Sequence, residues 1–214
     1  MKAYQTIVFD LDGTLTDPKV GITKSVAYAL KAYGIEVTDL DSLTPFIGPP
    51  LKDSFMEFYG FSEAKAMEAI NTYREYFSKT GLFENEKYDG IEKVLQSLKR
   101  KGKRLLVATS KPEPFAVEIL EYFGLTDYFE VIAGSKMNET RTTKAEVIAY
   151  ALEKAGIVDL NQVVMVGDRK HDCIGAAQCG IDSVGVLYGY GDLEELKAAG
   201  ATYIIAKVEE LAAL

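Results

Sequence analysis

Short apolar runs rich in β-branched residues recur along the chain, and each ends at a polar or glycine-rich turn. These runs lie at 5–9, 104–108, 162–166 and 181–187, with a weaker candidate at 130–132. Helix-like patterns lie between and after the later runs, at 112–123, 143–155, 170–179, 192–199 and 207–213. Because parallel strands need crossover connections, this alternation predicts an α/β fold with a doubly wound parallel sheet. The near-continuous apolar strands fit a sheet that helices cover on both faces.

The stretch 16–85 departs from this alternation because it contains no convincing strand. It carries helical patterns near 18–33, 50–60 and 62–79, with apolar residues at helical spacing. We therefore predict two domains, an α/β core formed by 1–15 and 86–214 and an inserted all-helical cap at 16–85. Such an insertion follows the first strand, at the edge where open α/β sheets bind their ligands.

Composition and charge narrow the classes of partner. Acidic residues outnumber basic ones 32 to 24 among 214 residues, a formal charge of −8, which argues against a nucleic-acid polymer as partner. No apolar run approaches the length of a membrane span or a signal-peptide core. Cys173 and Cys179 lie in one helix-like segment, which is poor geometry for a disulfide. We expect a cytoplasmic protein with no membrane partner, and the sequence predicts no oligomeric state.

Two acidic residues directly follow the first predicted strand, in the segment Phe9-Asp10-Leu11-Asp12-Gly13-Thr14. Gly13 allows a sharp turn of the backbone there. Two neighbouring carboxylates repel each other, so the site needs a bound cation, a protonated carboxyl group, or both. Oxygen ligands without nearby histidine or cysteine favour Mg²⁺ over Zn²⁺.

A second acidic pair, Asp168 and Asp172, follows the predicted strand at 162–166. A single aspartate at such a place is often only a helix N-cap. Both pairs, however, follow an apolar strand, and neighbouring parallel strands would bring Asp168 to Asp10. The sequence therefore predicts a metal site between the two strand ends.

Polar residues that could hold an anion lie elsewhere in the chain. Thr109 and Ser110 end another predicted strand just before a helix, where hydroxyl groups and free backbone N–H groups favour anions. Lys144 lies near a helix start, where it could equally be a solvated surface lysine. We expect His171 to be exposed and 188–191 to form a turn near the site.

Taken in order, DLDGT at 10–14, Thr109 in VATSK, Lys144 and GDRKHD at 167–172 resemble the four motifs of the haloacid dehalogenase-like (HAD) superfamily. The resemblance spans the chain and includes the helical insertion typical of a capped subclass. It is nearest to the phosphatases grouped with phosphoglycolate phosphatase. Ala145 stands where a proline often follows the lysine of the third motif, so Lys136 is the alternative to Lys144.

The resemblance implies a role for each acidic residue. Asp10 would be the nucleophile that forms an aspartyl-phosphate, and Asp12 would be the general acid and base. Mg²⁺ would be held by Asp10, by the backbone carbonyl of Asp12 and by Asp168. Asp172 would orient the third-motif lysine or a metal-bound water rather than bind the metal directly.

The resemblance also implies which residues bind substrate. Thr109, the backbone N–H of Ser110 and Lys144 would hold the phosphoryl oxygens, with Gly13 in the adjoining turn. Lys52 in the cap is a further candidate for contact with the substrate.

These assignments predict a Mg²⁺-dependent phosphatase that hydrolyses a small phosphorylated metabolite, of the phosphoglycolate or nucleoside 5′-monophosphate type. A sugar-phosphate mutase of the β-phosphoglucomutase kind and a pyrophosphatase are the alternatives. A dehalogenase is disfavoured, because it would leave Asp12 without a role. A non-catalytic binding or regulatory protein with a cap is the alternative outside enzymes.

Overall fold

A computed structural model describes residues 2–138 and 140–214 of the chain. The chain divides into two compact units. The core unit comprises the segment up to Asp17 together with Lys87–Leu214, and the helical unit is Pro18–Glu86. No helix among the described residues has the length and apolar character that a membrane span requires.

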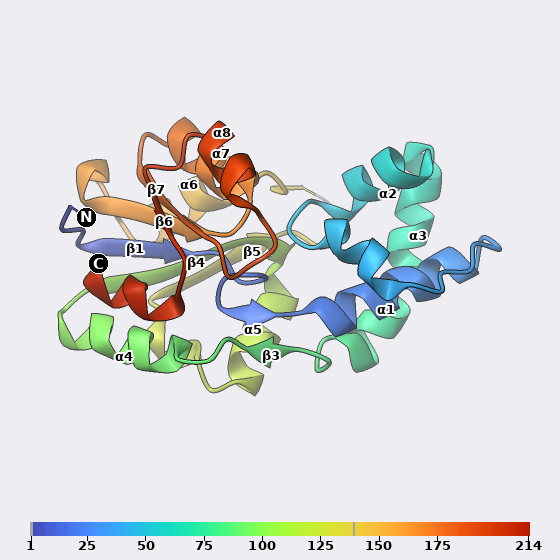
Figure 1. The fold of residues 1–214 in the computed structure, drawn as a ribbon, viewed down its shortest axis with the longest axis horizontal. Coiled ribbons are helices and arrows are strands. Elements are labelled where there is room, and N and C mark those ends of the chain that lie inside the picture. The colour runs from blue at the N-terminus through green and yellow to red at the C-terminus, as the bar shows by residue number, and fades with distance from the viewer. Residues whose placement is uncertain (1, 139) are drawn as a thin grey trace. The chain divides into compact units, whose positions relative to one another are not determined.

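A six-stranded sheet forms the centre of the core unit, in the order β5-β4-β1-β6-β7-β8 (Figure 1). Its strands are β1 Thr6–Phe9, β4 Arg104–Pro112, β5 Val131–Ser135, β6 Val163–Gly167, β7 Asp182–Val186 and β8 Tyr203–Ile205. Every neighbouring pair is parallel. The predicted fold class, an α/β protein with a parallel sheet, is confirmed.

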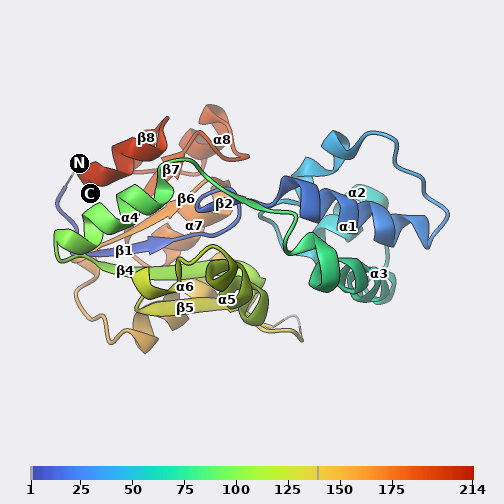
Figure 2. The same ribbon diagram turned by 90° about the horizontal axis from the view of Figure 1, so that it is seen from below.

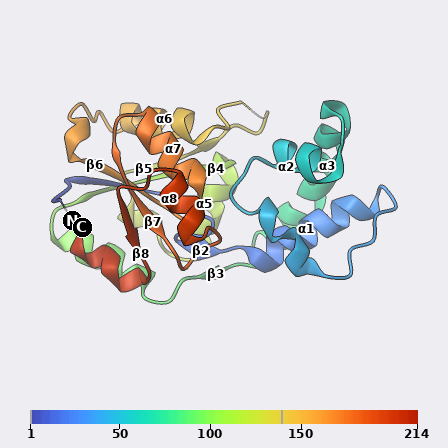
Figure 3. The ribbon, with the colours of Figure 1, turned by 45° about the horizontal axis from the view of Figure 1, so that its top comes forward.

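Helices cover both faces of this sheet. They are α4 Ile91–Arg100, α5 Glu113–Tyr122, α6 Lys144–Lys154, α7 Lys170–Gln178 and α8 Leu193–Ala198. Helices α6 and α7 lie side by side on one face (Figure 3), where Val147 and Ala176 pack with strand residues such as Val8 and Met165. Helices α4 and α5 lie on the opposite face (Figure 1).

Helix α4 is absent from the helices expected from the sequence, although its apolar residues carry the helical signal. Ile91, Val94, Leu95 and Leu98 follow the i, i+3, i+4, i+7 spacing, and all four are buried. Figure 2 shows α4 beside the C-terminal segment, where Val208–Ala213 forms a 3₁₀-helix that contacts it.

One short strand, β2, corrects the expectation that 16–85 contains none, and its partner β3 begins directly after that stretch. Strands β2 Thr16–Asp17 and β3 Glu86–Lys87 form a separate two-stranded sheet. At two residues each, they are too short to show the alternation that predicts a strand.

The helical unit contains α1 Lys19–Lys31, α2 Leu51–Tyr59 and α3 Glu63–Tyr76, with a 3₁₀-helix at Leu40–Phe46 and a π-helical turn at Phe77–Gly81. Aromatic rings form part of its interior. Phe46 and Phe55 pack edge to face with their centroids 5.0 Å apart, and Phe55 stacks on Phe61 at 5.9 Å. The Ser62 hydroxyl caps α3 by accepting from the N–H of Lys65.

Helix α1 meets the π-helical turn so closely that no side chain fits between them. A Cβ added to Gly21 would lie 1.9 Å from the carbonyl oxygen of Gly81, and the Gly21 N–H donates to the carbonyl of Glu84 at 2.9 Å. Both neighbours are backbone, so neither can move away alone.

We predict that Gly21→Ala destabilises the protein by about 1–3 kcal/mol, the usual cost of overpacking. At a helix position without this contact, the same change would stabilise by about 1 kcal/mol, because alanine is the better helix former. The sign of the change in the free energy of unfolding, measured by urea unfolding, therefore tests the contact. Lys31→Ala, an exposed substitution in the same helix, is the control, and increased stability of Gly21→Ala would contradict the prediction.

Candidate active site

The carboxyl ends of three neighbouring strands bring the predicted site residues together. Phe9, the last residue of β1, is in register with Val107 of β4 and Val166 of β6. The next residue, Asp10, donates its N–H to the carbonyl of Val166 at 2.9 Å. Asp10 and Asp168 therefore leave adjacent strands at the same edge of the sheet, as the sequence predicts.

A tight turn follows Asp10 and depends on Gly13. Gly13 has a φ of 80°, in the left-handed region that favours glycine. A Cβ added there would also lie 2.2 Å from Asp168 Oδ2. Gly13 thus serves both the turn and the close approach of the fourth-motif carboxylate.

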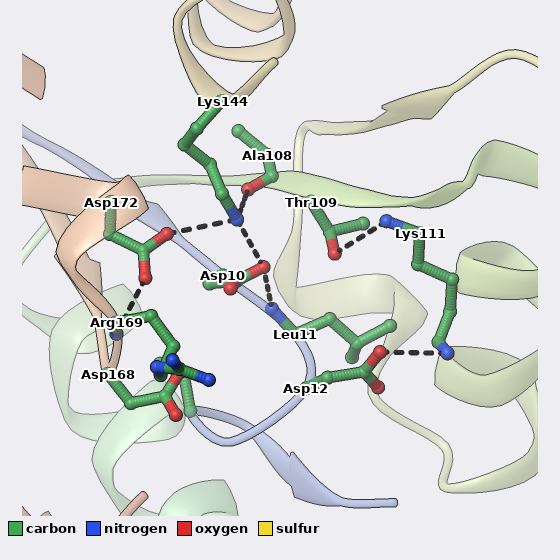
Figure 4. A network of polar contacts seen from close by, with 11 residues as sticks. Asp10, Leu11, Asp12, Ala108, Thr109, Lys111, Lys144, Asp168, Arg169 and Asp172 are labelled. Carbon is green, nitrogen blue, oxygen red and sulfur yellow. Dashed lines mark hydrogen bonds and ion pairs between the residues drawn. The ribbon is translucent and has the colours of Figure 1, made fainter. Parts of the chain in front are cut away.

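Lys144 lies between two carboxylates (Figure 4). Its Nζ is 2.7 Å from Asp10 Oδ1 and 2.9 Å from Asp172 Oδ1, and it donates to the carbonyl of Ala108 at 3.3 Å. Burial lowers the pKa of Lys144, but the attraction of Asp10 and Asp172 outweighs burial and raises it above its ordinary value. The lysine is therefore a fixed positive charge beside the expected nucleophile.

Local structure sets the position of Lys144. It is the first residue of α6, whose start is fixed by a capping box between Thr143 and Glu146. Gly175 of α7 lies so near that a Cβ there would be 2.9 Å from Lys144 Cβ. The side chain therefore enters the site from a well-defined helix start against a neighbouring helix.

Asp168 is fully buried and held from two sides. The Thr14 hydroxyl donates to its Oδ1 at 3.3 Å, and the N–H of Tyr190 donates to its Oδ2 at 2.8 Å. Burial, followed by the charges of Asp172 and Asp10, raises the pKa of Asp168 well above its usual range. A carboxylate in this position favours a nearby cation.

The turn at 188–191 lies against Asp168, and its glycines make this possible. A Cβ on Gly189 would lie 2.3 Å from Asp168 Cβ, and one on Gly191 would lie 2.0 Å from the Asp168 carbonyl oxygen. The sequence predicts a turn near the site. It does not reveal that Tyr190 donates to the carboxylate, because that donor is a backbone N–H.

Asp10, Asp168 and Asp172 form a group that could hold a metal ion. Each offers a carboxylate oxygen, and these oxygens lie within 4.8 Å of one another. Asp172 Oδ2 also accepts from the N–H of Arg169 at 3.0 Å. Burial raises the pKa of Asp172 to about 6, an effect that Lys144 opposes.

The charge balance of the site fits a divalent cation. Among the described residues, the buried acidic and basic side chains are Asp10, Asp12, Asp168, Asp172, Lys111 and Lys144. Four carboxylates and two ammonium groups leave two negative charges when all are ionised. Hard oxygen ligands of this kind suit Mg²⁺, so the donor set and its charge both fit the expected metal.

The second motif contributes a residue whose role the sequence does not reveal. The buried Thr109 hydroxyl accepts from the N–H of Lys111 at 3.2 Å, and the neighbouring Ser110 is half-buried. Lys111 Nζ lies 2.8 Å from Asp12 Oδ2, with both side chains at most 10% exposed. Its place two residues after Thr109 is the signal that could have identified it.

Two other candidates lie in different surroundings. His171 is half-buried, which corrects the expectation that it is exposed; burial and neighbouring positive charges lower its pKa. Lys52 belongs to the helical unit, where its Nζ lies 3.0 Å from Glu63 Oε1. Cys173 and Cys179 are both free thiols, as expected.

Comparison with known proteins gives the family. The family model for haloacid dehalogenase-like hydrolases matches residues 7–186. The chain belongs to this HAD-like hydrolase family. The match includes the segments of all four motifs described above, from Asp10 to Asp172.

Relatives in the HAD-like family carry different names. A 5′-nucleotidase from Pseudomonas aeruginosa is 49% identical over 99% of this chain and 94% of its own. The tyrosine-protein kinase PtkA of Mycobacterium tuberculosis is 42% identical over 97% of this chain and 71% of its own. The crystal structure of a predicted phosphatase from Clostridium acetobutylicum is 51% identical, covers 99% of this chain and 98% of its own, and superposes with a TM-score of 0.96.

We predict that Thr143→Ala lowers the free energy of unfolding by about 1 kcal/mol, because α6 loses the side chain that caps its first turn. Thr142→Ala, which keeps the capping box, is the matched control. Urea unfolding of both variants checks the prediction. An equal effect of the two substitutions would show that the capping box does not stabilise the start of α6.

Proposed function

We propose that this HAD-like hydrolase is a Mg²⁺-dependent phosphomonoesterase that acts through an aspartyl-phosphate. The observation that carries the proposal is the arrangement at Asp10. Its carboxylate is paired with a buried ammonium group, that of Lys144, and lies beside two further carboxylates. The ammonium group, together with a cation held by the carboxylates, would allow this anionic nucleophile to approach an anionic phosphate.

The residues proposed to hold Mg²⁺ are Asp10, Asp168 and the backbone carbonyl of Asp12, with Asp172 orienting Lys144. When bound, the ion would neutralise charge on the phosphoryl oxygens and on the nucleophile. Thr109, the N–H of Ser110 and Lys144 would bind the remaining phosphoryl oxygens, with Gly13 in the adjoining turn. Thr109 and Ser110 lie within β4, which extends past them to Pro112 and so corrects the expectation that they end the strand, and Lys144 lies at the start of α6. Donors on such regular elements suit preorganised binding.

In the first step, a carboxylate oxygen of Asp10 forms a bond to phosphorus as the bond to the ester oxygen breaks. Asp12 gives its proton to that oxygen, and the product leaves as an alcohol. Burial raises the pKa of Asp12, an effect that Lys111 opposes, so the carboxyl group can carry a proton closer to neutral pH than an exposed aspartate can.

In the second step, Asp12 accepts a proton from water as the water oxygen bonds to phosphorus. The bond between phosphorus and Asp10 breaks, which releases inorganic phosphate and restores the carboxylate. Asp12 is then protonated again and ready for the next substrate. One residue thus serves as acid and then as base.

We infer a small phosphorylated metabolite as substrate, and a nucleoside 5′-monophosphate is the first candidate. The name of the 49% identical relative, 5′-nucleotidase, supports this choice. Phosphoglycolate, pyrophosphate and a sugar phosphate carry the same phosphoryl group and remain alternatives. The name of the 42% identical relative, tyrosine-protein kinase, adds one more activity to test, the transfer of a phosphoryl group from ATP to a tyrosine side chain.

Asp10→Asn is predicted to reduce hydrolysis of the best substrate more than about 1,000-fold, because the amide cannot act as the nucleophile. The measurement is phosphate release with Mg²⁺, together with trapping of a ³²P-labelled protein after rapid quenching. Wild-type protein should carry label that hydroxylamine removes. Hydrolysis or labelling that survives in Asp10→Asn would rule out the aspartyl-phosphate.

Removal of metal is predicted to abolish hydrolysis, and added Mg²⁺ should restore it and raise the melting temperature. An ion that binds only the folded state stabilises it by about 2.7 kcal/mol at 100 times its dissociation constant. In Asp168→Asn the Mg²⁺-dependent rise should shrink, because a proposed ligand loses its charge. Equal stabilisation of the variant and the wild type would exclude Asp168 as a ligand.

The phosphate-release assay, run with Mg²⁺ on a panel of substrates, distinguishes the proposed phosphatase from the alternative functions. The panel contains nucleoside 5′-monophosphates, phosphoglycolate, pyrophosphate, β-glucose 1-phosphate, a phosphotyrosine peptide, and ATP with a tyrosine peptide. Inorganic phosphate from the small esters supports the proposal. Isomerised sugar phosphate would indicate a mutase, a labelled peptide would indicate a kinase, and binding without turnover would indicate a non-catalytic protein.

A further inference from the structure

The described residues include two buried lysines, Lys144 and Lys111. The first is paired with the proposed nucleophile. The second forms a separate ion pair in which Lys111 Nζ lies 2.8 Å from Asp12 Oδ2 (Figure 4). The mechanism above gives this second lysine no step.

Stability alone does not account for this ion pair. Taking two charges out of water is costly, and apolar residues of similar size often stabilise a protein as well or better. The side chains of Lys111 and Asp12 are only 5% and 10% exposed. A buried pair inside a catalytic site is therefore better explained by what it does to the site.

The two oxygens of Asp12 have different surroundings. Oδ2 is paired with Lys111, whereas Oδ1 is buried and has no hydrogen-bond partner among the described residues. A buried carboxylate oxygen without a donor is costly. One oxygen is thus fixed by the protein, and the other is left for a group that the protein itself does not supply.

The position of Lys111 is itself well defined. It belongs to β4, where the next residue, Pro112, pairs with Ser135 of β5, and its N–H donates to the Thr109 hydroxyl. The lysine thus connects the second motif to the second acid of the first motif. A lysine on a strand makes a stiffer support than one on a free loop.

We propose that Lys111 is a positioning residue that holds Asp12 by Oδ2, so that Oδ1 exchanges the proton with the ester oxygen and then with water. This inference rests on the proposed function and deepens it. The proton on Oδ1 passes to the ester oxygen as the bond between phosphorus and that oxygen breaks. Oδ1 later takes a proton from the attacking water, and Lys111 keeps its own protons throughout.

The test compares substrates that differ in their need for an acid. The leaving oxygen of an alkyl monophosphate, such as a nucleoside 5′-monophosphate, must receive a proton to depart as a neutral alcohol. The leaving group of p-nitrophenyl phosphate is a stable phenolate and needs no proton. In Lys111→Met, kcat/KM for the alkyl ester should fall about 100-fold, and that for p-nitrophenyl phosphate should fall no more than about 3-fold. In Lys111→Arg, which keeps the charge, most of the alkyl ester activity should return.

A double-mutant cycle separates this role from direct contact with substrate. If Lys111 acts through Asp12, then Lys111→Met should cause no further loss in an Asp12→Asn background. In the double variant neither side chain is ionised, so this arm remains measurable even if Lys111→Met alone folds poorly. Lys99→Met, at an exposed position on α4, is the control for removing a positive charge.

The outcomes separate the inference from the proposed function. Equal losses for both esters, or a further loss in the Asp12→Asn background, would overturn the positioning role. A rise in KM confined to substrates with a second anionic group would show that Lys111 binds substrate instead. Wild-type protein without Mg²⁺-dependent hydrolysis would refute the proposed function, whereas an active wild type with a failed cycle would refute only this inference.

Discussion

The site depends on holding four carboxylates close together inside the core unit. Like charges at this distance repel, and burial removes the water that would screen them. Lys144 lies between Asp10 and Asp172, and Lys111 pairs with Asp12, so two ammonium groups offset part of the repulsion. The remaining negative charge favours a cation at the site, where Asp10, Asp168 and Asp172 could hold one. Without the two ammonium groups, the carboxylates would be buried without a positive partner, which is strongly destabilising.

The site also requires backbone to pack closely against the acidic side chains, and glycines make this possible. Gly13, Gly167 and Gly189 each lie where a Cβ would be within about 2.3 Å of an acidic side chain. These contacts let the turns at Gly13 and Gly189 approach Asp168, and let Asp172 pack against Gly167 at the end of β6. A methyl group at any of them would move the carboxylates apart, so the geometry of the charges depends on the absence of side chains.

Patterns with many residues were readable from the sequence, whereas single contacts were not. The apolar strands predict the parallel sheet. The two acidic pairs predict the meeting of Asp10 with Asp168, because residues that follow adjacent parallel strands lie at the same edge of the sheet. The hydrogen bond from the N–H of Tyr190 has no sequence signature, since every residue except proline has a backbone N–H group. Helix α4 does carry such a pattern, the buried apolar face from Ile91 to Leu98, so its segment was readable from the sequence although the expected helices do not include it. The partner of Lys111, Asp12, lies far from it in the sequence, so the ion pair becomes visible only in the fold.

The helical unit interrupts the core unit after Asp17, and this has a consequence for how the chain folds during synthesis. Strand β1 lies between β4 and β6, so its neighbours on both sides come from the later part of the chain. Thr14 and Asp168, which share a hydrogen bond, are 154 positions apart. During synthesis, the first strand must wait for most of the polypeptide before its sheet can close. Contacts of such long sequence separation slow folding, and the helical unit, which is continuous in sequence, can fold in the meantime.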